Sequence, residues 1–420
     1  MARLFRAVAV TLVAALAPAP ALADDWTGYG DYGDFGDSGD IGDVVDWAFP
    51  TDDPSDFASD VDEDFEPDQI LALNLGRRSA GILRTLGFRI REARKLRALK
   101  LTLYRLRPPR GMTGRQALAE LRKADPQGYY DQNSIYRLAG ARTTAPGACE
   151  GVRCYGQAMI GWSAAGCGVR VRLGMLDTAV NVRHPALAGR KVVTERLART
   201  PAADSDHGTA VAALLVGAAD SPFPGLLPEA ELFAADVFSV DSQGHASTDA
   251  AELAKGLDWL AAQRPDAINI SITGPDGGVL HTAILRVTRL GIGVVAAAGN
   301  LGPKSPPQFP AAYREVIAVT AVDRQSRVYA NASQGRYVSL AAPGVDIWTA
   351  GAGGAGVFRE GTSFATPFAT AAVAILKARE PALAPEAALG ALRRRARDLG
   401  PPGIDAIYGS GLLQAQACGI

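Results

Sequence analysis

Four polar residues of this chain have the types and the spacing that acyl transfer requires. Asp177 ends an apolar run typical of a buried strand, and His207 begins the helical pattern of residues 207–216. Ser363 stands in the motif GTSFATP ahead of an apolar helical pattern, and Asn300 ends the run AAAGN. A serine hydroxyl needs a base to become a nucleophile, the base needs a carboxylate to orient it, and the developing oxyanion needs an amide donor. Each residue alone is more typical of a structural cap, so the interpretation depends on all four together.

The remaining histidines and the cysteines show no metal-binding pattern. His184, His245 and His281 stand in stretches without other candidate ligands and are predicted to be surface or loop residues. Neither a Cys-x-x-Cys nor a His-Glu-x-x-His spacing occurs, which disfavours a zinc site. We therefore expect no metal and no cofactor.

Composition indicates a folded chain of two or three domains. The 420 residues are 48% hydrophobic and 21% charged, which is too apolar for wholesale disorder, and four cysteines are too few for a disulfide-built scaffold. The net charge of -1 hides a strong asymmetry, because residues 1–23 carry +2, 24–68 carry -17, 69–140 carry +12 and 141–420 carry +2. Neutrality is thus a cancellation between adjacent segments.

Residues 1–23 have the three parts of a secretory signal peptide. Arg3 and Arg6 precede an apolar run, Pro18 and Pro20 interrupt it, and a small-residue stop, ALA, follows. The interrupted run is too short for a stable membrane anchor. The mature protein is therefore expected to be soluble and either secreted or periplasmic.

The acidic segment at 24–68 is predicted to be a disordered linker. It contains the repeat DYG, DFG, DSG, DIG, in which the carboxylates repel one another and the glycines resist ordering. Because the segment lacks the ligand spacing of an EF-hand loop, we do not infer calcium binding there.

Residues 69–140 indicate a small, basic α/β unit. Strands are predicted at 70–75, 99–106 and 134–138, and helices at 80–86 and 115–123, the second capped by Thr113. The +12 charge would suit nucleic acid, but the bases follow no zinc-finger or aromatic-spaced RNA motif, so no nucleic-acid partner is expected. The nearest acidic partner is the chain's own segment 24–68.

From residue 169 onward, short apolar runs alternate with helical patterns. Strands are predicted at 169–176, 232–238, 267–272 and 293–298, and helices at 207–216, 248–262, 279–290 and 368–376. This alternation is typical of a parallel sheet covered by helices on both faces. Functional groups in such a sheet lie at the carboxyl ends of the strands, where Asp177 and Asn300 are expected.

In this order along the chain, Asp177, His207, Asn300 and Ser363 resemble the catalytic residues of the subtilisin-like serine peptidases, the subtilase family (peptidase family S8). The resemblance covers residues 155–415. It implies an α/β fold in three layers, with a parallel central sheet flanked by helices, preceded by a small α+β, ferredoxin-like prodomain.

The same resemblance implies a secreted serine endopeptidase that hydrolyses protein or peptide substrates through an acyl-enzyme intermediate. Ser363 would attack, His207 would transfer the proton, Asp177 would orient His207, and Asn300 with the Ser363 backbone amide would bind the oxyanion. The alternative is a catalytically silent, subtilase-like binding protein. It is disfavoured because all four chemical positions are filled.

Substrate-binding residues are also implied by the resemblance, namely Ser271, Ile272, Thr273, Gly274, Ala298, Gly299 and Gln308. Gln308 falls at the expected base of the specificity pocket, where it would make the pocket shallower and more polar than a glycine would. The stretch 219–228 is short and proline-rich where some members of the family build a calcium loop, so that site is not carried over.

Domain roles follow from the family pattern. Residues 69–140 would be an inhibitor-like prodomain, the chain's own intramolecular inhibitor, whose tail at 136–140 reaches the catalytic serine. Self-cleavage is predicted between residues 138 and 150, with 141–168 as a linker and 169–420 as the peptidase domain. We expect the mature enzyme to be a monomer.

The four cysteines suit an exported enzyme and permit three pairings. Cys149 and Cys154 enclose only four residues and can bridge, which leaves Cys167 and Cys418 for a bond between the two ends of the peptidase domain.

Overall fold

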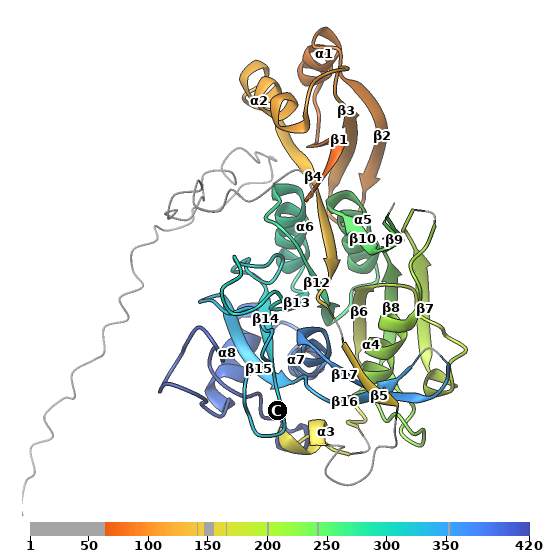
Figure 1. Ribbon diagram of the computed structural model, residues 1–420, viewed down its shortest axis with the longest axis vertical. Coiled ribbons are helices and arrows are strands. Elements are labelled where there is room, and N and C mark those ends of the chain that lie inside the picture. Colours follow the sequence, from red (N-terminus) through yellow and green to blue (C-terminus); the bar gives the residue numbers. More distant parts are fainter. Residues whose placement is uncertain are drawn as a thin grey trace, which may run out of the picture. The chain divides into compact units, whose positions relative to one another are not determined.

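The computed structural model describes residues 64–140, 142–146, 155–164, 166–199, 201–241, 243–351 and 353–420 (Figure 1). All of these residues belong to one compact unit that spans residues 44–420. The predicted signal peptide, nearly all of the predicted acidic segment, and Cys149 and Cys154 lie outside the described residues.

Residues 64–140, called here the N-terminal unit, have the element order β-α-β-β-α-β. The elements are β1 (Phe65–Leu73), α1 (Arg77–Thr85), β2 (Arg89–Leu96), β3 (Leu101–Arg107), α2 (Gly114–Ala124) and β4 (Tyr129–Leu138). The strands form an antiparallel sheet in the order β2-β3-β1-β4, the arrangement of a split β-α-β unit. An apolar core joins the sheet to both helices, with Ile70, Leu83, Leu106 and Leu121 all buried.

The predicted elements of this unit are present, with two differences. Thr113 caps α2 through a capping box with Gln116, as expected. Strand β2 was not predicted, because its sequence RIREARKL lacks apolar alternation at an exposed edge of the sheet. Strand β1 begins at Phe65, inside the stretch expected to be acidic linker, because pairing with β4 orders it there.

Residues 155–420, called here the C-terminal unit, contain a seven-stranded parallel sheet in the order β15-β14-β13-β11-β6-β8-β7. Its strands are β6 (Arg172–Asp177), β7 (Lys191–Arg196), β8 (Glu231–Asp236), β11 (Ala267–Ile270), β13 (Gly293–Ala297), β14 (Ile317–Val322) and β15 (Val338–Pro343). The central strands are buried on both faces, which explains their continuous apolar runs. The four predicted strands are confirmed.

Helices cover both faces of this sheet, so the unit has the three layers expected. Helices α5 (Ala250–Ala262) and α6 (Gly278–Arg289) pack on one face, and α4 (Asp206–Val216) and α7 (Thr362–Arg379) on the other. The outer elements are α3 (Tyr155–Met159), α8 (Pro385–Arg395) and two 3-10 helices, Pro185–Leu187 and Gln416–Cys418. Figure 1 shows α5 and α6 next to the N-terminal unit.

Helix α7 starts six residues before the predicted helix and contains Pro367. Proline has no N–H, so the Ser363 carbonyl four residues earlier lacks its helical partner. It accepts instead from the Ser271 hydroxyl at 3.3 Å. The proline is tolerated because a neighbouring segment supplies the missing donor.

Strand β4 extends the sheet of the N-terminal unit into the C-terminal unit. It pairs with β10 (Ala246–Asp249), which continues to β9 (Ser239–Val240), and also with β12 (Ile272–Thr273). A smaller sheet is formed by β5 (Arg142–Pro146), β16 (Ile347–Ala350) and β17 (Gly356–Glu360). Main-chain hydrogen bonds thus join the N-terminal unit, through β4, and the segment 142–146, through β5, to the C-terminal unit.

A disulfide links Cys167, just before β6, to Cys418 near the end of the chain. This is one of the pairings that the cysteine spacing permitted. Among the helices that the structure describes, none combines the length and the apolar character needed to cross a bilayer.

Candidate active site

Asp177 and His207 meet at the carboxyl edge of the parallel sheet. Asp177 is the last residue of β6, and His207 is the second residue of α4. His207 Nδ1 lies 2.7 Å from Asp177 Oδ1, which also accepts the Thr178 backbone N–H at 2.7 Å. Both side chains are buried, so the carboxylate fixes the orientation of the imidazole in a site with little water.

Ser363 lies in the first turn of α7, where backbone N–H groups have no partner within the helix. Its hydroxyl donates to the Ala139 carbonyl at 2.8 Å. His207 Nε2 is buried and has no hydrogen-bond partner among the described residues. In this arrangement the serine hydroxyl therefore touches the carbonyl group of the chain's own tail.

Asn300 reaches the same carbonyl from the end of β13. Its side-chain Nδ2 donates to Ala139 O at 2.6 Å. The amide is held in this orientation because its Oδ1 accepts from Thr362 twice, from the backbone N–H at 3.1 Å and from the hydroxyl at 3.0 Å. The same Nδ2 also donates to the Gly140 carbonyl at 2.5 Å, so the amide contacts both carbonyls, and the Ala139 carbonyl is the one that the Ser363 hydroxyl also contacts.

Gly361 leaves the space that these contacts need. Its φ of +137° lies in a region that favours glycine, and a Cβ there would come within 2.9 Å of both Asn300 Nδ2 and the Gly140 carbonyl. A side chain at this position would push the oxyanion donor or the tail out of place.

The tail of the N-terminal unit lies extended along the site. Leu138 and Arg137 pair with Ile272 and Thr273, and the Ala139 N–H donates to Ser271 O at 3.0 Å. Beyond the serine, residues 142–146 pair with β17. The predicted substrate-binding strand pairs here with an extended segment of the chain itself.

Gly274 and Gln308, two of the predicted substrate-binding residues, each have a close neighbour. Tyr136 is fully buried and packs on Gly274, where an added Cβ would lie 2.4 Å from the tyrosine Cδ1. Gln308 is buried, and its Cγ would lie 2.7 Å from a Cβ added at Gly299. Ala298 is buried beside them, and its carbonyl accepts from the Tyr337 hydroxyl.

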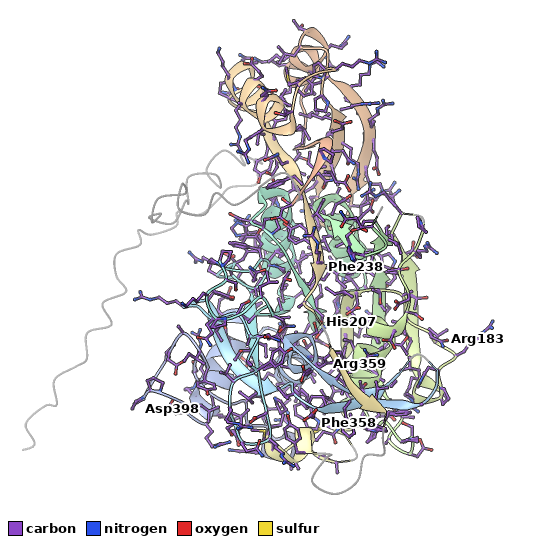
Figure 2. The ribbon with its side chains drawn as sticks, in the orientation of Figure 1. Arg183, His207, Phe238, Phe358, Arg359 and Asp398 are labelled. Carbon is purple, nitrogen blue, oxygen red and sulfur yellow. A yellow bond between two sulfur atoms is a disulfide. The ribbon has the colours of Figure 1, made fainter. Side chains whose placement is uncertain are left out.

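Sequence reasoning missed two contacts that fix the catalytic residues. The Thr362 hydroxyl accepts from the Gly299 N–H at 3.2 Å while it orients the Asn300 amide. Arg359 on β17 forms an ion pair with Asp206, the residue before His207. Figure 2 labels Arg359 and His207. The sequence did offer a hint of this ion pair, because Asp206 directly precedes His207 and Arg359 stands four residues before Ser363.

The three other histidines lie apart from this site. His184, predicted to be a surface or loop residue, lies in a loop but is only 1% exposed, and its Nδ1 accepts the Ala186 N–H and so caps the 3-10 helix Pro185–Leu187. His245 is exposed, and His281 stacks on Tyr313 and contacts Glu315. Across the described ranges, no cluster of three or more His, Cys, Asp or Glu side chains could hold a metal ion.

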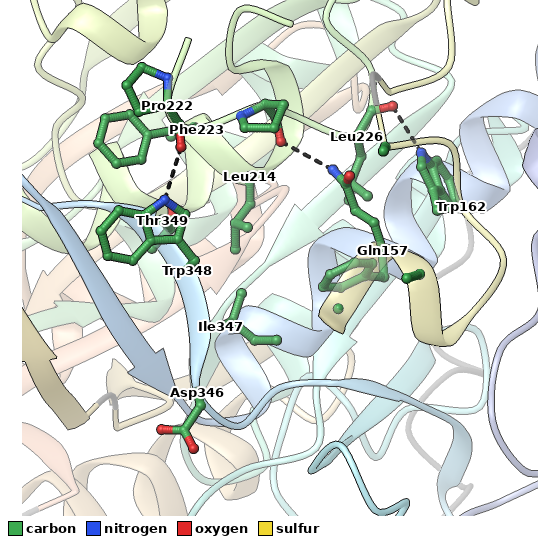
Figure 3. A pocket seen from close by; sticks show the side chains of 16 residues that line it. Gln157, Trp162, Leu214, Pro222, Phe223, Leu226, Asp346, Ile347, Trp348 and Thr349 are labelled. Carbon is green, nitrogen blue, oxygen red and sulfur yellow. Dashed lines mark hydrogen bonds between the residues drawn. The ribbon is translucent and has the colours of Figure 1, made fainter. Parts of the chain in front are cut away.

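The short stretch 219–228 borders an apolar cavity of about 320 Å³ (Figure 3). Three of its carbonyls, those of Pro222, Pro224 and Leu226, accept from side chains across the cavity. The donors are the Trp348 indole at 2.9 Å, the Gln157 amide at 3.1 Å and the Trp162 indole at 3.1 Å. These oxygens already serve as hydrogen-bond acceptors, which is a physical reason not to infer a cation site from this loop.

Comparisons with known proteins agree with this geometry. Residues 168–411 match the family model described as the Subtilase family, Peptidase_S8. The minor extracellular protease Epr of Bacillus subtilis (strain 168) is 29% identical over 327 residues, which are 75% of this chain and 50% of that protein. Subtilisin BL of Lederbergia lenta is 31% identical over 253 residues, which are 60% of this chain and 91% of that protein.

Solved structures show the same fold. Fervidolysin from Fervidobacterium pennivorans, a keratinolytic enzyme related to subtilisin, superposes with a TM-score of 0.72 at 23% identity, over 86% of this chain and 62% of that chain. The S41 psychrophilic protease superposes with a TM-score of 0.51 at 26% identity, over 59% of this chain and 92% of that chain. The chain spans half the length of Epr.

Proposed function

The chain belongs to the subtilase family of serine peptidases, and on that premise we propose that it is a secreted serine endopeptidase made as a zymogen that cuts itself. One observation carries this proposal. The Ala139 carbonyl accepts from both the Ser363 hydroxyl and the Asn300 amide, the two groups that acyl transfer at this site requires. Residues 64–140 then act as a prodomain, and residues 155–420 contain the peptidase domain. The name of the extracellular relative Epr supports export.

The proposed cut breaks the bond between Ala139 and Gly140. Ser363 Oγ attacks the Ala139 carbonyl carbon while His207 Nε2 takes the hydroxyl proton, and Asp177 stabilises the charged imidazole through Nδ1. The carbonyl oxygen becomes an oxyanion held by Asn300 and by the Ser363 backbone N–H.

The intermediate then collapses. His207 gives its proton to the Gly140 nitrogen, the C–N bond breaks, and Ala139 remains esterified to Ser363. Water, deprotonated by His207, attacks this ester and leaves a free carboxylate on Ala139 and a free serine hydroxyl. The same two half-reactions would hydrolyse protein or peptide substrates of the monomeric mature enzyme.

Gln308 gives this site a preference for small side chains before the cut. The glutamine is buried and packs on the Gly299 position, and its Nε2 donates to Pro306 O at 2.8 Å, so it is held in place. A residue in the tail that precedes the cut, Ala139, is itself small. The proposed specificity is therefore for alanine-sized residues rather than large aromatic ones.

The test compares the full chain with its Ser363→Ala variant, using Ser221→Ala as a remote serine control. Wild type and control should yield a new terminus at Gly140 and an activity that a serine-directed inhibitor abolishes. Ser363→Ala should remain uncut and lose about 10⁶-fold in kcat. Cutting of Ser363→Ala at the same bond would refute self-processing, and a processed but inactive wild type would favour the silent binding protein.

A further inference from the structure

Arg105 lies at the centre of the contact between the prodomain and the peptidase domain. It stands on β3 of the prodomain and is only 8% exposed. Its guanidinium binds both oxygens of Asp249, at 3.0 and 3.1 Å, and donates to Glu252 at 2.7 Å. Within the prodomain, Gln69 accepts at 2.8 Å and Glu92 lies 3.1 Å from Nε. All three nitrogens of the guanidinium are thus engaged.

Asp249 and Glu252 lie together in a buried position at the start of α5. Asp249 caps the helix by accepting the Glu252 N–H at 3.0 Å, and both carboxylates are buried. Burial and the neighbouring charge of Asp249 raise the pKa of Glu252. Burial also opposes ionisation of Asp249, but Arg105 and Arg199 hold its pKa below the ordinary value. Two adjacent buried carboxylates need a cation between them.

We propose that Asp249 and Glu252 form a guanidinium site on the peptidase domain, and that Arg105 in this site holds the prodomain on the enzyme after the tail has been cut. This inference rests on the proposed function. The tail inhibits by occupying the cleft, whereas the guanidinium site retains the inhibitor. The planar, bidentate contact requires arginine, because the single charge of lysine cannot bind both carboxylates in the same way.

The charges around the site allow the prodomain to leave. Arg199 of the peptidase domain also binds Asp249, at 2.7 Å, and Lys255 lies 3.5 Å from Glu252. In the docked state these cations also bind prodomain acids, Lys255 to Glu92 and Arg199 to Glu66, both at 2.7 Å. When the prodomain departs, both cations remain beside Asp249 and Glu252 and can neutralise them. Binding of the cut prodomain through this site is therefore reversible.

Solvent reaches this network from one side. A cavity of about 520 Å³ is lined by Arg105, Arg199, Glu252 and Lys255 together with other residues of both domains. Ions in the cavity can compete with the Arg105 contacts and screen them. Release of the prodomain is expected to accelerate with ionic strength.

The test uses the full chain with Arg105→Gln, Arg105→Lys and, as a matched control, Arg107→Gln. Arg107 is two residues further along β3, is exposed, and is 3.9 Å from its partner Asp68. In the wild-type background, each variant should be cut after Ala139. The cut prodomain of Arg105→Gln should dissociate at least about 30-fold more readily in size-exclusion chromatography, with Arg105→Lys intermediate and Arg107→Gln unchanged.

A second measurement does not depend on cutting. In the uncut Ser363→Ala chain, hydrogen–deuterium exchange of β4 and of the start of α5 should accelerate at least tenfold with Arg105→Gln, and with Glu252→Gln if Arg105→Gln misfolds. Equal exchange in Arg105→Gln, Glu252→Gln and Arg107→Gln would overturn the guanidinium site. Loss of cutting in every chain, with the exchange difference intact, would instead refute self-processing alone.

Discussion

The N-terminal unit, which we propose to be the prodomain, contacts the peptidase domain in two regions that use different chemistry. Its tail lies in the catalytic cleft and is held chiefly by main-chain pairing, as between Leu138 and Ile272. Its sheet lies on α5 and α6 and is held by side chains, with Arg105 bound to Asp249 and Glu252. Main-chain pairing accepts any extended peptide, as a protease cleft must, whereas side-chain contacts select one partner.

The sheet region also supplies hydrogen-bond acceptors to backbone N–H groups at the starts of two helices. Asp131 accepts the Val279 N–H at the start of α6, and Asn133 accepts the Ala251 N–H at the start of α5. Such groups have no partner within their own helix. The sheet region therefore supplies acceptors to the starts of α5 and α6, while the tail region lies beside the candidate catalytic residues.

The largest effect is expected in the tail region, from Asn300→Ala. Removing the donor to the Ala139 carbonyl should lower kcat by about 10²–10³-fold, the loss known for the equivalent donor of subtilisin. Retention of the prodomain should change little, because the sheet contact is intact. Steady-state kinetics and size-exclusion chromatography measure the two quantities.

A graded control comes from Thr362→Val, which removes one of the two bonds that orient the Asn300 amide. It should cost about tenfold or less in kcat. If Asn300→Ala released the prodomain as readily as Arg105→Gln, the division between the two regions would be wrong.

The two regions also differ in how much of them the sequence could reveal. Asp177, His207, Asn300 and Ser363 stand in local motifs at strand ends and helix starts, so their meeting could be predicted. The Arg105 contact joins residues 144 and 147 positions apart. One more arginine in a basic unit carries no local pattern, so only the folded arrangement shows that it is buried.

Similar reasons explain the other misses. Strand β2 is an exposed, charged edge without apolar alternation, and the start of α7 was hidden by Pro367, which usually ends a helix. Thr362 looked like part of a motif, but its role depends on the Asn300 amide that another strand brings beside it.

A smaller effect is expected from Ala139→Phe, which changes the tail only at the cut. Because the buried Gln308 fills space beside Gly299, a phenyl ring should not fit, and self-cleavage should slow by about 10–200-fold. Gln308→Gly in the same chain should restore most of the rate. The time course of precursor loss on a denaturing gel measures this.

Leu138→Phe is the matched control, since it adds the same ring one residue earlier. In Ala139→Phe, its Gln308→Gly double variant and Leu138→Phe, the prodomain that has been cut should stay bound to the peptidase domain as it does in wild type. Cutting of Ala139→Phe at the wild-type rate would show that Gln308 does not limit the pocket.

The smallest effect is expected in the pH dependence of prodomain docking, which involves Asp131 in the sheet region. Burial raises the pKa of the Asp131 carboxyl from 3.8 to about 6, despite the Val279 N–H and Arg122, and Asp276 adds to the rise. Between about pH 4 and 6 the docked prodomain therefore keeps a proton that the free prodomain loses. This group stabilises docking as pH falls from 7 towards 4 and weakens it as pH rises through 6.

Asp131→Asn stays neutral and can still accept the Val279 N–H, so it should hold the prodomain more tightly than wild type at pH 7.5, by about tenfold or more, and this difference should shrink to a few-fold at pH 4.5. Size-exclusion chromatography across this range measures the difference, with Asp68→Asn, an exposed carboxyl of the same unit, as control. Parallel pH curves for Asp131→Asn and wild type would mean that Asp131 stays charged while docked. The sheet region would then depend on ionic strength through Arg105 but not on pH through Asp131.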